Sequence, residues 1–185
     1  MSTVPRAIVT RRLRLEATGP AHADGMWSAV ESSQREIRPW MAWAIAPTLE
    51  DTLAFVVGAE REWDRGTSRN FTILLDREVI GSVGINRVEP VLLAAQVGYW
   101  LRTDHNNRGY MTEAASATVE FAFAELGLHR LELHAAPDNR ASARVAQKLG
   151  FRREGLLRDG ARGVGGWHDV DVYGLLASDE RPRLH

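Results

Sequence analysis

The sequence predicts a single α/β domain in which strands and helices form a mixed layer structure. The chain has 185 residues, a length that is typical of one domain and sufficient for a hydrophobic core. Apolar residues make up 44% of the chain and charged residues 25%, as in packed globular proteins. Segments with strand-like patterns alternate with longer segments of helical periodicity, and no repeat or linker divides them.

The predicted strands share alternating apolar side chains or are rich in β-branched and aromatic residues. They cover residues 7–15, 70–75, 79–85, 95–101, 130–135, 151–157 and 169–176. A polar turn at 76–78 joins the second and third of them into a hairpin. Four glycines at 160, 163, 165 and 166 are followed by a strand, which is typical of a flexible hairpin loop.

The predicted helices have apolar side chains three and four residues apart. They cover 20–33, from 48 to near 66, 110–126 and 139–149. Thr48 followed by Asp51 is typical of a helix start, and glycines at 66, 127 and 150 of helix ends. The first helix places Met26, Trp27 and Val30 on one side, and the third buries Val119, Ala122, Phe123 and Leu126.

Composition excludes several classes of protein. The 23 basic and 24 acidic residues nearly balance, which excludes the strongly basic surface of a dedicated nucleic-acid binder. The chain has no cysteine, so disulfides, thiolate metal sites and a cysteine nucleophile are excluded. It has no leader-like segment and no apolar run of about 18 residues. We therefore expect a cytoplasmic protein without direct membrane or nucleic-acid partners; whether it forms a homodimer stays open.

A short polar loop, TDHNNRG (103–109), lies between a predicted strand and a predicted helix. A helix N-terminus presents unpaired N–H groups, and Gly109 lets the backbone approach an anion without an intervening side chain. Arg102 and Arg108 add positive charge. Two interpretations fit this pattern, a phosphate-binding loop and an ordinary strand-to-helix turn. The motifs of P-loop hydrolases and of dinucleotide-binding proteins are absent.

Several segments together resemble one known family. GYWLRTDHNNRGYMTEAA (98–115) resembles the acetyl-CoA-binding segment of the GNAT acetyltransferase superfamily, and PDNRASARVAQKLGF (137–151) resembles its second signature. WHDVDVYGLL (167–176) and RPWMAW (38–43) resemble segments of its RimJ/RimL branch, the ribosomal-protein N-terminal acetyltransferases. The resemblance covers about residues 7–177, nearly the whole chain.

The resemblance implies a GNAT fold: a twisted, mostly antiparallel sheet of about seven strands, flanked by about four helices and splayed at the cofactor-binding strand. It implies one N-acetyltransferase domain over 1–185, with its core at 7–177 and a polar tail at 178–185 that we expect to be frayed. Acetyl-CoA is the implied acetyl donor, with no metal. The implied coenzyme-binding residues are Trp100, Leu101, Arg102, Asn107, Arg108, Gly109, Tyr110, Met111, Thr112, Asn139 and Ser142.

Three positions depart from the pattern of the family. Asn106 stands where the family usually has Gln or Arg, which weakens one coenzyme contact. Met111 stands where Gly or Ala is usual, a substitution that RimL-like members tolerate. Gln96 stands where many relatives carry a glutamate, so this chain lacks that carboxylate as a base.

His134 and Ser142 are the candidate catalytic residues. His134 lies five residues before Asn139, where several protein N-terminal acetyltransferases place a glutamate, and an unperturbed histidine titrates near 6.5. Ser142 is the candidate acid that protonates the departing thiolate. Structural roles fit equally: a histidine at a sheet edge, a surface serine, and Asn139 as a helix cap. His168 and Glu89 are weaker candidate bases, and Arg140 and Arg144 fit either coenzyme phosphates or a solvated helix face.

The acceptor pocket is expected to include Trp40, Trp43 and Trp167, while Trp27 and Trp63 are expected in the core. An α-amine titrates near 7.7–8.0 and lysine near 10.4, so deprotonating lysine costs about 3.5 kcal/mol more. A weak base therefore suits a protein N-terminus, the acceptor that the RimL resemblance implies, by direct attack in a ternary complex. A small amine such as an antibiotic or polyamine is the alternative acceptor. A non-catalytic acyl-CoA sensor is the alternative of another class.

Overall fold

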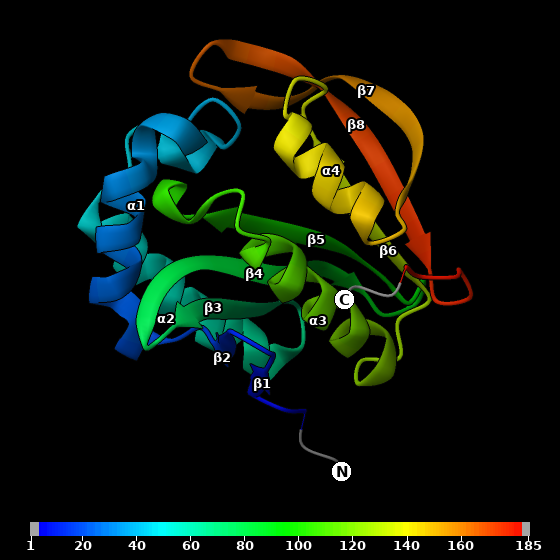
Figure 1. Ribbon diagram of the computed structural model, residues 1–185, viewed down its shortest axis with the longest axis horizontal. Helices are drawn as coiled ribbons and strands as arrows, with labels where there is room; N and C mark the ends of the chain where they lie inside the picture. The colour runs from blue at the N-terminus through cyan, green and yellow to red at the C-terminus, as the bar shows by residue number, and fades with distance from the viewer. Residues whose placement is uncertain (1–3, 183–185) are drawn as a thin grey trace.

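The computed structural model describes residues 4–182 and arranges them as one twisted sheet covered by helices on both faces (Figure 1). Its strand order is β1-β2-β3-β4-β5-β6-β8-β7. Every neighbouring pair is antiparallel except β5 and β6, which are parallel. The strands are β1 (Ala7–Val9), β2 (Arg14–Ala17), β3 (Arg69–Leu75), β4 (Glu78–Glu89), β5 (Ala94–Leu101), β6 (Arg130–Ala135), β7 (Arg152–Gly163) and β8 (Gly166–Leu176).

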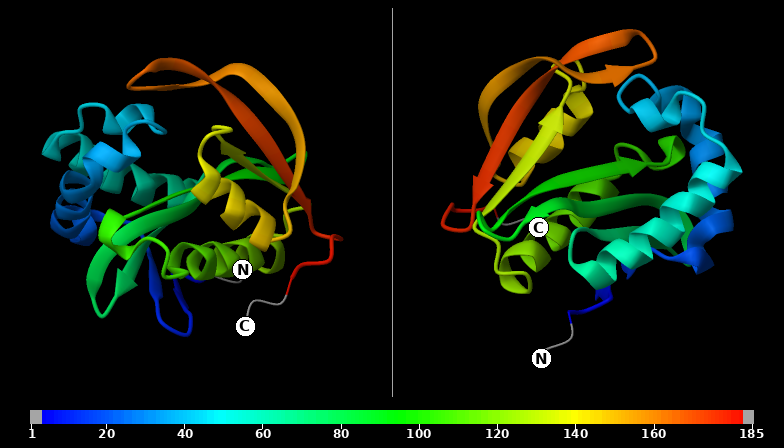
Figure 2. Two further views of the ribbon diagram at one scale, coloured as in Figure 1. Left: turned by 45° about the horizontal axis from the view of Figure 1, so that its top comes forward. Right: turned by 180° about the vertical axis from the view of Figure 1, so that it is seen from behind.

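Two helices lie on each face of the sheet. Helices α3 and α4 lie on the face that points to the viewer in Figure 1, and α1 and α2 cover the opposite face (Figure 2). The α-helices are α1 (Ala23–Ile37), α2 (Leu49–Arg65), α3 (Tyr110–Ala124) and α4 (Arg140–Lys148), and short 3₁₀ turns are η1 (Pro20–His22), η2 (Ala42–Ala44) and η3 (Thr103–His105). Within 4–182, no helix combines the length and the apolar character that crossing a membrane requires.

Strands β5 and β6 diverge, as the family resemblance implied. They pair only from Ala94 to Val97 and from Arg130 to Leu133. Beyond these residues β5 continues along β4 to Leu101, whereas β6 continues along β8 to Ala135. A wedge therefore opens between the two strand ends, and main-chain groups on its walls lack a neighbouring strand.

The prediction of one strand over residues 7–15 is wrong. The chain turns there, because the Thr10 N–H donates to the Leu13 carbonyl oxygen at 2.9 Å and the Leu13 N–H donates to Thr10 Oγ1 at 3.0 Å. The loose alternation therefore belongs to two short paired strands, β1 and β2. This turn raises the strand number to eight within the described residues, against the expected seven or so.

An aromatic cluster fills the core between α2, β3 and α3. Trp63, Phe71 and Phe121 meet with ring centroids 5.1–6.3 Å apart, and all three are buried. The predicted apolar stripe of α3 is correct for Val119 and Ala122, which are buried. Phe123 and Leu126, also predicted to be buried, are only partly covered, and Phe121 is buried instead. Trp27, expected in the core, is also only partly covered, and the buried residues of α1 include its neighbours Met26 and Val30.

Both ends of the C-terminal region differ from expectation. Strands β7 and β8 extend well past their predicted ends, so the glycines at 160 and 163 lie inside a long hairpin. The tail is anchored as far as Arg181, which contradicts the expected fraying of this part: Arg181 donates to Glu120 of α3 at 2.7 Å, and Asp179 accepts from the Leu176 N–H at 2.9 Å. An ion pair between Arg181 and Glu120 holds this tail, and sequence periodicity does not reveal such a contact. Residues 183–185 lie outside the described part.

Candidate active site

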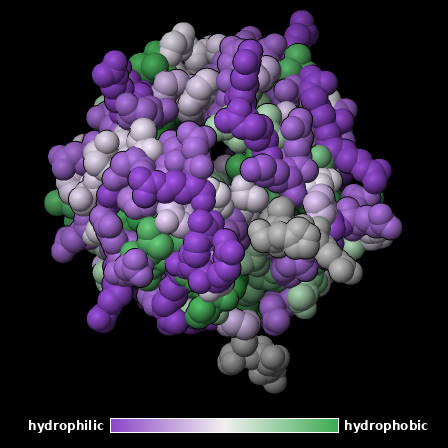
Figure 3. All heavy atoms as spheres, in the orientation of Figure 1, coloured by the Kyte–Doolittle hydropathy of each residue, from purple (hydrophilic) through white to green (hydrophobic). Residues whose placement is uncertain are grey.

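A cavity of about 660 Å³ occupies the wedge between β5 and β6, a size typical of ligand sites. Figure 3 shows the molecule hollowed near the centre of this face, with hydrophilic side chains around the hollow. The described residues that line it include three permanent cations, Arg87, Arg144 and Lys148, and one carboxylate, Glu36. An anionic ligand is therefore favoured there.

The N-terminus of α3 forms one end of this cavity. Gly109 is its N-cap, with φ of 79°, and no side chain caps the helix. In contrast, Thr48 caps α2 and Asn139 caps α4 through hydrogen bonds to main-chain N–H groups. Gly109, Tyr110, Met111 and Thr112 all line the cavity, so the first amides of α3 are left for a ligand.

At the end of β5 near Leu101, the main-chain groups of every second residue face the wedge. The Arg102 N–H donates to the Ile80 carbonyl at 2.8 Å, and the Arg102 carbonyl accepts from the His105 N–H at 3.0 Å. In an antiparallel ladder, alternate residues turn away from the partner strand, so the main-chain groups of Tyr99 and Leu101 face the wedge. The structure therefore favours Leu101, and not Trp100 or Arg102, for main-chain contact with a ligand.

The guanidinium of Arg102 is engaged as well. It forms two hydrogen bonds with the Asp104 carboxylate, at 2.8 and 2.6 Å, and also pairs with Glu78. These contacts hold the pKa of Asp104 well below its usual range. Asp104 in turn lies 2.7 Å from Nδ1 of His105, a buried histidine on the cavity wall that the sequence interpretation missed. The adjacent Asp-His pair in the sequence was the available signal.

Ser142 and Asn139 meet at the start of α4, on the opposite wall. The Asn139 side chain accepts from the Ser142 N–H at 3.1 Å, so its role as a helix cap is realised, and it lines the cavity as well. Ser142 Oγ lies 2.9 Å from the hydroxyl oxygen of Tyr99. Burial raises the pKa of Tyr99 to about 12, although its hydrogen bond to Ser142 acts in the opposite direction. The contact between Tyr99 and Ser142 joins β5 to α4, so only the folded structure reveals it.

His134 lies on the β6 wall, with Nε2 3.1 Å from Oε2 of Glu132. Glu132 also accepts from Arg130 at 2.9 Å. Burial raises the pKa of the Glu132 carboxyl, but hydrogen bonds from Arg130 and His134 outweigh that effect and lower it overall. Glu132 stands opposite Gln96 in the parallel ladder, so a carboxylate is present one strand away from the position where relatives carry theirs.

The other candidate residues divide into those on the cavity and those away from it. His168, Arg144, Asn106 and Asn107 line it, whereas Arg108, Arg140 and Arg102 do not. Glu89 is exposed near the opposite end of β4 and pairs with Ala94, far along the strand from the wedge. Glu89 is therefore removed from consideration as a base.

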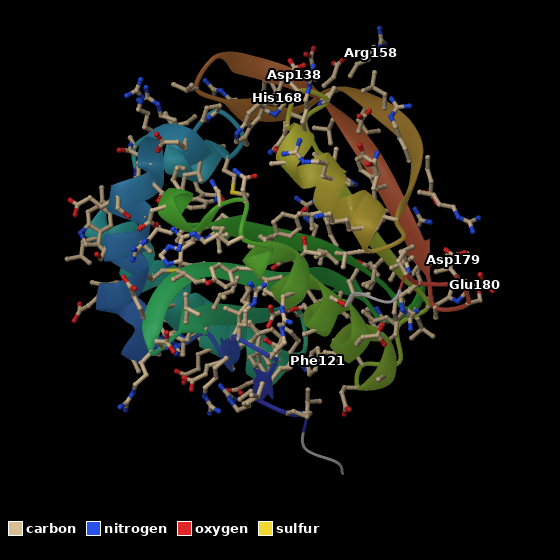
Figure 4. All side chains as sticks on the ribbon, in the orientation of Figure 1. Phe121, Asp138, Arg158, His168, Asp179 and Glu180 are labelled. Atoms are coloured by element: carbon tan, nitrogen blue, oxygen red, sulfur yellow. The ribbon has the colours of Figure 1, made fainter. Side chains whose placement is uncertain are left out.

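A second cavity, of about 500 Å³, lies between the β7–β8 hairpin and the start of α4. Trp40 and Trp167 both line it, while Trp43 instead packs edge-on against Trp100, with ring centroids 5.9 Å apart. Asp138 and His168, which also line it, lie near each other at the top of Figure 4. Trp40, Ala136 and His168 border both cavities, so the two are adjacent.

Within the described residues, no three His, Asp or Glu side chains gather as metal ligands would. The model of the family described as "Acetyltransferase (GNAT) domain" matches residues 12–152, most of the chain. The chain belongs to the GNAT acetyltransferase family. GNAT enzymes transfer an acetyl group from acetyl-CoA to an amine without a metal, and the wedge with its uncapped amides fits that coenzyme.

Individual relatives place this GNAT chain in the RimJ/RimL branch. It is 28% identical to the ribosomal-protein-serine acetyltransferase of Escherichia coli, over 93% of this chain and 97% of that one. It is 40% identical to the probable N-acetyltransferase YjcK of Bacillus subtilis, over 57% and 59% of the two chains. This GNAT chain therefore spans less than two thirds of YjcK and nearly all of the E. coli enzyme.

Solved structures of RimL and RimJ enzymes resemble this chain as well. RimL, a ribosomal L7/L12 α-N-protein acetyltransferase in complex with coenzyme A, has a TM-score of 0.86 at 25% identity, with 94% of this chain and 97% of that one covered. RimJ of Mycobacterium smegmatis with CoA-disulfide has a TM-score of 0.83 at 27% identity, with 89% and 82% covered. The GNAT fold and its RimJ/RimL character thus hold in sequence and in structure.

Proposed function

We propose that this GNAT chain acetylates the N-terminal α-amine of a protein. The observation that carries the proposal is the match, over nearly the full length of both chains, to enzymes named for acetylating ribosomal proteins. The choice of a protein N-terminus is specific to this proposal, because the GNAT family as a whole acetylates amines of many kinds.

The adjacency of the two cavities supports an extended acceptor. A chain end entering through the second cavity reaches the first past Trp40, Ala136 and His168. The described lining of the second cavity contains two carboxylates, Asp138 and Asp169, and neither lysine nor arginine. An α-amine is largely protonated as it arrives, so this charge favours its entry.

The residues around the wedge supply the proton transfers of a direct attack. Acetyl-CoA supplies a thioester whose carbonyl carbon accepts the amine nitrogen. When His134 Nε2 donates to Glu132, Nδ1 is left to take the proton from the amine. The Ser142 hydroxyl, held by Tyr99, protonates the leaving sulfur. The free N–H of Leu101 stabilises the developing oxyanion, an effect typically of about 3–4 kcal/mol per donor.

The test presents acetyl-CoA together with three acceptors. These are a short peptide with a free N-terminus and no lysine, the same peptide with a blocked N-terminus and an added lysine, and a polyamine. Release of free CoA is followed with time, and mass spectrometry locates the added acetyl group. We expect acetylation of the free N-terminus at a kcat/KM at least about tenfold above that of the other two.

Two outcomes would contradict the proposal. Preferred acetylation of the polyamine or of the lysine side chain would assign a different acceptor class. Tight coenzyme binding in calorimetry without turnover, on peptides that begin with each residue type, would instead indicate a sensor.

A further inference from the structure

The turn between β1 and β2 contacts α3, the helix that follows the loop at 103–109, although about one hundred residues separate them in the sequence. Thr10 Oγ1 donates to Glu113 Oε1 at 2.7 Å, and the Arg12 N–H donates to the same oxygen at 2.8 Å. The Arg12 Nε–H donates to Glu113 Oε2 at 2.7 Å. The Glu113 carboxylate is thus held by three donors from one short turn.

Arg12 also reaches the loop itself. Its Nη1 donates to the carbonyl oxygen of Arg108 at 3.0 Å, and its guanidinium carbon lies 4.5 Å from the ring centroid of Tyr110. One guanidinium therefore joins the carboxylate of Glu113, the carbonyl just before Gly109 and the ring just after it. A planar fork with several fixed donors suits this bridging, and a lysine does not.

The loop has physical reasons to need such support. Asn107 and Gly109 both adopt left-handed backbone conformations, with φ of 61° and 79°, and the former costs a non-glycine residue energy. No side chain caps the helix at Gly109. The amides that would bind a diphosphate thus have no side-chain cap, and Arg12 contacts the loop from outside.

Charge gives a second reason. Glu113 lies in the first turn of α3, where a free carboxylate would repel a phosphate group bound at the same helix end. Arg12 neutralises this carboxylate, and neither Arg12 nor Glu113 lines the cavity. The negative charge is therefore paired on the side of the helix away from the ligand.

We propose that Arg12, with Thr10 and Glu113, is a positioning residue for the coenzyme: it orients the amides of residues 107–110 before the diphosphate binds. We call these three residues the loop clamp. The proposal rests on the acetyl-CoA of the proposed function placing its diphosphate at the uncapped N-terminus of α3. It requires nothing of the acceptor.

The test measures the binding of CoA and of S-acetyl-pantetheine, which lacks the diphosphate, by calorimetry. The variants are Arg12→Ala and Arg12→Lys, with Arg14→Ala as the control, because Arg14 is an exposed arginine of the same hairpin that pairs only with Glu16. We expect Arg12→Ala to raise the Kd for CoA about tenfold. Arg12→Lys should raise it nearly as much, because lysine keeps the charge but cannot bridge. Affinity for S-acetyl-pantetheine should stay within twofold throughout.

A second readout uses the protein without coenzyme. Amide hydrogen exchange of residues 107–112 should be faster in Arg12→Ala than in wild type, and unchanged in Arg14→Ala. The kcat at saturating acetyl-CoA should stay within twofold, since Arg12 touches no reacting group. If Arg12→Ala does not fold, Arg12→Lys alone decides the question.

Two results would overturn the loop clamp. One is a lowered melting temperature with unchanged Kd for CoA, which would show that these contacts serve stability alone. The other is an equal loss of affinity for CoA and S-acetyl-pantetheine, which would place the effect in the wedge and not at the diphosphate. Failure of the peptide acetylation test would leave both measurements valid, because neither uses an acceptor.

Discussion

The two cavities that meet at Trp40 are built in different ways. The coenzyme cavity is walled by main-chain groups of β5 and α3 and by side chains that hold one another, such as Tyr99 with Ser142. The second cavity is walled by exposed side chains on a protruding hairpin; Trp167, for example, is 67% exposed. Main-chain geometry defines the first site and replaceable side chains define the second. Substitutions in the first cavity should therefore change coenzyme affinity or kcat, and substitutions in the second should change the KM for the acceptor.

Gly109→Val should abolish most coenzyme binding. A Cβ on Gly109 would point to Arg12, with Nη2 at 3.4 Å, and not into the cavity, so the damage comes through the backbone. A left-handed conformation costs a branched residue about 1–2 kcal/mol, and each lost charge-assisted hydrogen bond about 1.5–3 kcal/mol. We expect the Kd for CoA to rise more than about 100-fold in calorimetry. Gly58→Val, on open helix surface, is the control, and retained affinity in Gly109→Val would count against this loop.

His134→Ala should lower kcat about 100-fold at neutral pH and leave coenzyme affinity unchanged, as expected for the loss of a general base. The deficit should shrink at high pH, where the amine loses its proton without help. A pH–rate profile of the variant, beside that of Glu89→Ala as the exposed control, measures this. An unchanged profile would remove His134 from the mechanism.

Tyr99→Phe should lower kcat about tenfold, since it removes the hydroxyl that holds Ser142 while keeping the ring. Ser142→Ala should lower kcat at least as much, and the double variant should be no worse than Ser142→Ala. Tyr173→Phe, a buried tyrosine in β8, is the matched control. Additive losses in a double-mutant cycle would show that the two hydroxyls act separately.

Trp40→Ala should raise the KM for a peptide acceptor roughly fivefold, with an unchanged Kd for CoA, if side chains define the second cavity. Trp43→Ala should instead disturb the coenzyme side, because Trp43 packs against Trp100. Steady-state kinetics on one peptide, together with calorimetry on CoA, separates the two. A change in CoA affinity in Trp40→Ala, without one in KM, would remove the contrast between the cavities.

Glu113→Gln should cost a small amount of stability, and this cost should depend on pH. Burial raises the pKa of Glu113, but hydrogen bonds from Thr10 and Arg12 outweigh it, so the folded-state pKa lies below the ordinary value of 4.5. The stabilisation is therefore complete above about pH 4.5 and is lost as pH falls through the lowered pKa. Urea unfolding of both proteins at pH 7 and pH 4 should show the difference shrinking. A constant difference would contradict the ion pair.

What could be predicted from the sequence depends on whether a feature is set by neighbouring residues or by residues far along the chain. The element order after residue 17, the helix start at Thr48 and the start of α3 after Gly109 depend on neighbouring residues, and these predictions are confirmed. The hairpin at residues 7–15, with its local bonds between Thr10 and Leu13, was missed, as were the contacts of that turn and of the tail with α3, about sixty to one hundred residues away. The bond of Ser142 to Tyr99 needed the fold as well, since the two residues lie on α4 and β5, whereas the bond of His134 to Glu132 joins alternate residues of one strand.

The pairing of β5 with β6 has one further consequence. Four residue pairs form the main-chain ladder that joins the β1–β5 half of the described sheet to the β6–β8 half. Such a short seam is the natural line along which the two halves separate in partial unfolding. Whatever fills the wedge beside it raises the free energy of that opening by mass action. Bound acetyl-CoA should therefore stabilise the joint between the two halves of the sheet.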